Sequence, residues 1–147
     1  MSGLFDVCDS LFDAGFDWLF ATKTRVFEVF NFTLFFAWAV AAMVDPRMFA
    51  SAAYAGFGVA GSSVLATGFL AMSLMSLLGI FSAKTDSRFL GGYSLFLSSF
   101  VWALVSAGFI VAYPPLTTAM VLYPQLSLLC FLVGRKVIAD SARYREK

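Results

Sequence analysis

The chain has 147 residues, of which 61% are hydrophobic and 13% are charged, and its formal net charge is +1. A soluble domain of this size leaves too much surface in water to hide so many apolar side chains, so the composition excludes a soluble protein and predicts a membrane protein. No basic run is interleaved with aromatic residues, which argues against a nucleic-acid partner.

The first predicted element is an amphipathic helix over residues 3–20. Its acidic residues are three, four and four positions apart, so they share one helix face: Asp6, Asp9, Asp13 and Asp17. The opposite face is apolar, and such a helix can lie in the headgroup layer with that face toward lipid. Two interpretations of the acidic face stay open. It is either a solvated surface or a docking face for a basic protein segment, such as the tail of this chain or of another copy.

Four transmembrane helices are predicted next, over residues 26–44, 57–81, 89–112 and 117–134. Residues 89–134 form a run of 46 residues without Asp, Glu, Lys or Arg. That run covers two crossings of a hydrocarbon core of about 30 Å, with Pro114 and Pro115 in the turn between them. The predicted fold is an all-α, integral membrane four-helix bundle. It forms one domain of three parts: an interfacial helix (1–22), the membrane helices (23–134) and a charged cytoplasmic tail (135–147).

Two polar residues lie in the first turns of the first membrane helix, Glu28 and Asn31. Because they are close to the predicted membrane edge, we expect them to reach interfacial water. The alternative is a buried, functional carboxylate at Glu28.

The distribution of cations predicts the orientation of the chain. Nine Lys and Arg residues lie in the N-terminal segment, the loop between the second and third helices, and the tail, whereas the opposite side has only Arg47. By the positive-inside rule, both termini are expected to be cytoplasmic.

Small residues recur at helical spacing in the second and third membrane helices. Such residues let helix backbones approach closely, where packing replaces the hydrophobic force that is absent in lipid. They are candidates for helix packing or for the interface of a homo-oligomer: Gly56, Ala60, Gly61, Gly68, Ser99, Ala103 and Ala107. The sequence leaves open whether their partners are in the same chain or in another copy.

Residues that catalysis requires are scarce. The chain has no histidine, its serines lack a basic partner within the membrane, and the three later helices carry no ionisable residue near their middle. Cys8 and Cys130 are interpreted as small apolar residues, and a mixed Cys/His zinc site is excluded. We therefore expect a protein that is not an enzyme and has no cofactor or metal. A small transporter is a weaker alternative.

Scattered residues also carry a resemblance, over residues 24–136: Phe30, Asn31, Trp38, Asp45, Pro46, Tyr54, Arg88, Gly91, Ser98, Trp102, Pro114 and Tyr123. In this pattern the chain resembles small four-helix membrane proteins of tailed bacteriophages, which are commonly labelled membrane proteins or holins. The resemblance implies insertion into the inner membrane of a host bacterium, oligomerisation, and holes that release an endolysin. The alternative function is a non-enzymatic membrane interaction protein that excludes a second phage or docks a cytoplasmic partner on its acidic face.

Overall fold

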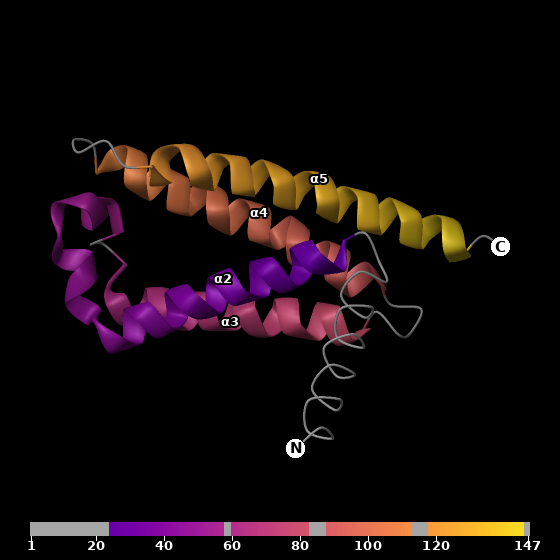
Figure 1. The fold of residues 1–147 in the computed structure, drawn as a ribbon, viewed down its shortest axis with the longest axis horizontal. Coiled ribbons are helices and arrows are strands. Elements are labelled where there is room, and N and C mark those ends of the chain that lie inside the picture. The colour runs from indigo at the N-terminus through magenta and orange to yellow at the C-terminus, as the bar shows by residue number, and fades with distance from the viewer. Residues whose placement is uncertain (1–23, 58–59, 83–87, 113–117, 146–147) are drawn as a thin grey trace, which may run out of the picture.

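The computed structural model describes residues 24–57, 60–82, 88–112 and 118–145, and this part of the chain contains helices and no strand. Figure 1 shows the long helices and, at one end of the molecule, two short 3₁₀ helices. In chain order the elements are α2 (Arg25–Val44), η1 (Pro46–Ala50), η2 (Ala52–Phe57), α3 (Ser62–Ser82), α4 (Arg88–Val111) and α5 (Ala119–Arg145). The amphipathic helix predicted over residues 3–20 lies outside the described residues.

The four α-helices of the described residues are long and apolar enough to span a membrane, which confirms the prediction of a helical fold with four such helices. Their apolar stretches are 20, 21, 23 and 24 residues long. At about 1.5 Å per residue, each stretch covers a hydrocarbon core of about 30 Å. Large apolar side chains such as Leu78, Leu104 and Leu128 are exposed on the outside of the helices. This outer surface suits lipid rather than water.

Two helix boundaries differ from the prediction. The second spanning helix begins at Ser62 rather than at residue 57, because residues Ala52–Phe57 form η2 and Gly61 takes a φ of +72°, a left-handed conformation that glycine adopts without strain. The last helix does not end at Gly134 but runs on to Arg145. No proline or further glycine follows Gly134 to stop it, so most of the predicted tail belongs to α5.

The helices form two antiparallel pairs, α2 with α3 and α4 with α5 (Figure 1). The pairs meet mainly where α3 ends and α4 begins, and they diverge toward the end that carries η1 and η2. Within the described residues, α2 has few close backbone contacts with α4 and none with α5. The first pair is therefore joined to the second chiefly by α3, by η2, which packs on α4, and by side chains.

Glycines lie at the closest helix contacts. A Cβ atom added to Gly79 of α3 would lie 2.9 Å from the Cα atom of Gly91 in α4. One added to Gly134 of α5 would lie 3.0 Å from the carbonyl oxygen of Gly92 in α4. Only residues without a side chain allow backbones to approach this closely, which is the usual role of small residues between membrane helices.

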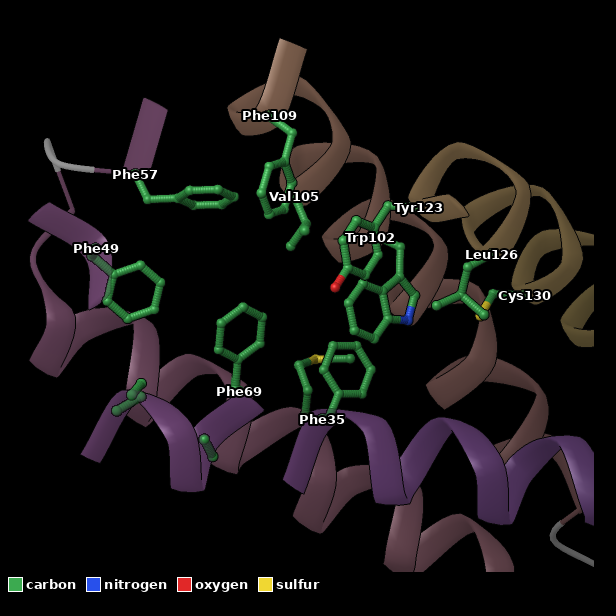
Figure 2. Packing of buried hydrophobic residues seen from close by; sticks show 14 residues of the cluster. Phe35, Phe49, Phe57, Phe69, Trp102, Val105, Phe109, Tyr123, Leu126 and Cys130 are labelled. Atoms are coloured by element: carbon green, nitrogen blue, oxygen red, sulfur yellow. The ribbon is translucent and has the colours of Figure 1, made fainter. Parts of the chain in front are cut away.

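Aromatic side chains fill the space where the two helix pairs diverge (Figure 2). The 3₁₀ helices contribute to this core from the side: Phe49 of η1 and Phe57 of η2 are both buried. Large rings are an efficient filling here because each one buries a large apolar area. The buried aromatic residues of the core are Phe35, Phe49, Phe57, Phe69, Trp102, Phe109 and Tyr123, and Phe27, Trp38 and Tyr54 are partly buried against them.

Candidate functional site

The inner face of α2 carries polar residues at the same spacing as its apolar ones. Phe35 and Ala39 are buried in the core, and Glu28 and Asn31 precede them on the same face. Because residues three and four apart share a helix face, the packing of Phe35 also turns Asn31 inward. Asn31 is 0% exposed and Glu28 is 8% exposed. The expectation that both residues reach interfacial water is therefore wrong.

Asn31 uses its whole hydrogen-bonding capacity inside the protein. Its amide nitrogen donates to the hydroxyl oxygen of Ser98 at 2.9 Å and to that of Ser76 at 3.3 Å. Its amide oxygen accepts from the indole Nε1 of Trp102 at 2.9 Å and from the thiol of Cys130 at 3.5 Å. An asparagine side chain offers two donors and two acceptor positions, and all four are occupied. One side chain on α2 thus contacts α3, α4 and α5.

The serines around Asn31 have further partners. Ser76 and Ser94 are joined by a hydrogen bond of 3.3 Å between their hydroxyl oxygens, and Ser98 donates to the Ser94 carbonyl oxygen at 2.7 Å. All these residues are buried. We define the Asn31 centre as the residues that share this network: Asn31, Ser76, Ser94, Ser98, Trp102 and Cys130.

The chemistry of the Asn31 centre is hydrogen bonding rather than proton transfer, because none of its members is an acid or base near neutral pH. Polar groups in a low-dielectric interior are costly when unpaired and strongly held when paired, so a satisfied network fixes one arrangement of the helices. The carboxyl group of Glu28 lies beyond the centre toward the start of α2. Its Oε1 would be 3.7 Å from a Cβ atom added to Gly91 of α4.

Stacked rings border the centre on the side away from Glu28. Phe35 stacks on Trp102 with ring centroids 4.5 Å apart, and Trp102 stacks on Tyr123 at 5.3 Å. Tyr123 continues the stack to Phe109 at 5.5 Å. Figure 2 shows Trp102 between Phe35 and Tyr123. Rings from α2, α4 and α5 therefore close this end of the polar centre with apolar surface.

Two of the seven predicted packing residues make contacts within the chain. Gly56 lies directly against the backbone of Gly108, so η2 packs on α4. Ser99 is buried, and its carbonyl oxygen accepts a hydrogen bond of 2.7 Å from the hydroxyl of Ser127 in α5. The other five are exposed on the outside of the molecule, on α3 or just before it and on α4: Ala60, Gly61, Gly68, Ala103 and Ala107.

The exposed candidates do not form one site. Gly68 belongs to the outer face of α3, where Ser63, Thr67 and Ala71 are also exposed and four residues apart. Near this face, a groove of about 310 Å³ lies between the end of α2 and the start of α3. A Cβ atom added to Gly68 would have no heavy atom within 4 Å. Packing inside the chain therefore gives no reason for a glycine at this position.

The Asn31 centre and the glycine contacts of α3, α4 and α5 were not predicted as sites. The helical spacing of Glu28, Asn31 and Phe35 on one face was the signal that could have indicated the burial of Asn31. Among the described residues, no group of three His, Cys, Asp or Glu residues could hold a metal ion. The predicted docking face lies outside the described residues: Asp6, Asp9, Asp13 and Asp17.

Comparison with known proteins gives no relative: no protein-family model, no curated protein and no solved structure matches this chain. The likeness to phage membrane proteins therefore stays a prediction. The described part of the chain combines four helices apolar enough to span a membrane with a closed polar centre inside and a face of small residues outside.

Proposed function

We propose that this chain is an integral protein of a bacterial inner membrane that associates with copies of itself through the outer face of α3 and permeabilises the membrane, in the manner of a phage holin. The observation that carries the proposal is the exposed small-residue face of Ser63, Thr67, Gly68 and Ala71.

A small-residue face is suited to contact with another helix. Residues four apart share a helix face, and small side chains let a second backbone come close enough for extensive packing. The hydroxyl of Thr67 donates to the Ser63 carbonyl oxygen at 2.8 Å, so it is already satisfied within α3 and costs little to cover. Other exposed positions on α3 carry large side chains, such as Leu74 and Leu78, which suit lipid. Two copies in the same orientation could cross at Gly68.

The charge distribution supports a location with both termini in the cytoplasm. The start of α2 and the end of α5 lie at the same end of the molecule, and η1 lies at the other end (Figure 1). Arg135 and Lys136 belong to α5, whereas η1 carries Arg47. This arrangement agrees with a predominance of cations on the cytoplasmic side.

The test combines the oligomeric state with the membrane potential. In Gly68→Leu the added side chain should separate the α3 faces, lower the fraction of cross-linked dimer and delay the collapse of the potential in single bacterial cells. Ala103→Leu is the matched control, since it adds a large side chain to an exposed small residue of α4. Lysis should require a co-expressed endolysin. An intact potential at high membrane expression would refute permeabilisation, and unchanged cross-linking in Gly68→Leu would refute the α3 interface.

A further inference from the structure

The connection between α2 and the second helix pair depends on side chains. In the described residues, α2 and α5 have no close backbone contact, and α2 and α4 have few. They are joined by the hydrogen bonds from Asn31 to Ser98, Trp102 and Cys130 and by the stacking of Phe35 on Trp102. The ring of Trp38 in α2 adds contacts with Phe109 and Tyr123. Close backbone contacts with α4 lie elsewhere, at Gly79 of α3 with Gly91 and at Gly56 of η2 with Gly108.

Most of the described hydrogen bonds between the two pairs come from Asn31, and one further bond joins Ser76 and Ser94. Ser98 donates to the carbonyl oxygen of Ser94 one turn earlier in α4, and Ser106 donates in the same way to that of Trp102 at 2.7 Å. These serine donors keep their bonds when the pairs separate. Asn31 has no hydrogen bond to its own helix among those described, so it would lose its partners on α4 and α5, namely Ser98, Trp102 and Cys130. Of its described bonds it would keep the one of 3.3 Å to Ser76 of α3.

The inner faces that would be uncovered are suited to water. Ser73 and Ser76 of α3, and Ser94, Ser98 and Ser106 of α4, are buried in the closed chain. Hydroxyl groups in contact with lipid find no additional hydrogen-bond partner, whereas in an opening filled with water they are solvated.

We infer that Asn31 is a lock between the helix pairs: it holds the chain in the closed form, and its release turns the serine-lined inner faces of α3 and α4 toward water. This lock deepens the proposed function, because the uncovered serines would supply the polar lining of the opening. The existence of the lock does not depend on that use.

The native thiol of Cys130 reports whether the centre opens, since it is fully buried and bonded to Asn31. The experiment uses the full chain in lipid vesicles, with Cys8→Ser so that Cys130 is the only thiol, and measures its rate of alkylation by a water-soluble maleimide. Asn31→Leu removes two hydrogen bonds to the second helix pair, those to Ser98 and Trp102, besides the thiol contact. At an average factor of nearly three for each such bond in a membrane, we expect alkylation to be roughly eightfold faster.

Two further variants make the result interpretable. Thr33→Val is the matched control on α2, because Thr33 is exposed and its hydroxyl bonds only to the Val29 carbonyl oxygen. Its rate should equal that of the parent. Ser98→Ala removes only one partner of Asn31 and should give a rise of roughly threefold. If protease sensitivity shows that Asn31→Leu does not fold, the test rests on the rate of Cys130 alkylation in Ser98→Ala. A rate equal to that of the parent overturns the lock.

The failure of the lock and the failure of the proposed function have different signatures. Faster alkylation of Asn31→Leu in vesicles, with an intact membrane potential in cells that express it strongly, would leave the lock standing and remove permeabilisation. If the parent chain collapses the membrane potential but the alkylation rate of Cys130 is unchanged in Asn31→Leu and Ser98→Ala, permeabilisation stands and the lock is refuted. If both proposals hold, Asn31→Leu should also collapse the potential earlier than the parent.

Discussion

Two glycines of the same helix should respond in opposite ways to the same substitution. In Gly79→Ala the new Cβ atom would lie 2.9 Å from the Gly91 Cα atom and 3.4 Å from its nitrogen. Carbon atoms in favourable contact are about 3.5–4.0 Å apart, so α3 and α4 would have to separate by roughly 0.6–1 Å. Overpacking of this kind costs about 1–3 kcal/mol, and we expect the free energy of unfolding to fall by that amount.

Gly68→Ala is the matched comparison. It adds the same methyl group to α3 at a position where nothing lies within 4 Å. Alanine favours a helix over glycine by up to about 1 kcal/mol, so the free energy of unfolding should stay unchanged or rise by no more than that. The assay is equilibrium unfolding in mixed micelles, at a dilution where the chain is monomeric. If Gly79→Ala proves as stable as the parent, or Gly68→Ala loses as much as Gly79→Ala, the assignment of a close helix contact at Gly79 and of open space at Gly68 is wrong.

Two further predictions concern the interior and the orientation of the chain. Trp102→Phe keeps a ring between Phe35 and Tyr123 but removes the indole N–H that donates a hydrogen bond to Asn31. Because the buried amide oxygen of Asn31 loses this donor, the free energy of unfolding should fall by about 1–3 kcal/mol in the same assay. If Trp102 contributed only by stacking, the free energy of unfolding would not change. A green fluorescent protein fused after Lys147 should fluoresce, and alkaline phosphatase fused there should be inactive; active phosphatase would contradict a cytoplasmic C-terminus.

The spanning helices could be predicted because the signal is long and simple. Charge-free runs of the required length, divided by Pro114 and Pro115, leave few alternatives once the backbone must satisfy its hydrogen bonds internally. The surroundings of Asn31 could not be predicted from its depth alone. Its nearness to the end of a helix predicted contact with water. Its burial is instead determined by the helix face that it shares with Phe35, because Phe35 points into the core.

The roles of individual glycines could not be predicted from the sequence for a related reason. Gly68 and Gly79 both stand in an apolar helix among small residues, and nothing local separates them. The two glycines are eleven residues, or about three turns, apart, so they lie on nearly the same side of α3. Their difference arises from the divergence of the helix pairs: Gly79 is pressed on Gly91 near the end of α3, whereas nothing lies within 4 Å of a Cβ atom at Gly68. Spacing predicts which residues share a face, but the partner of that face is determined by the whole bundle.

The length of α5 has a mechanical consequence. The helix is continuous for 27 residues, from Ala119 to Arg145, with no break at Gly134. Residues 135–145 therefore extend the helix that carries Cys130 by about 16 Å. This extension is packed in the bundle, because Ile138 lies against Gly92 of α4 and both Val137 and Ser141 are buried. A tilt of α5 by about 10° about Gly134 would displace the far end of the extension by about 3 Å and would have to part Ile138 from Gly92. A movement at Cys130 would thus reach the basic end of the chain through the packed turn at Ile138.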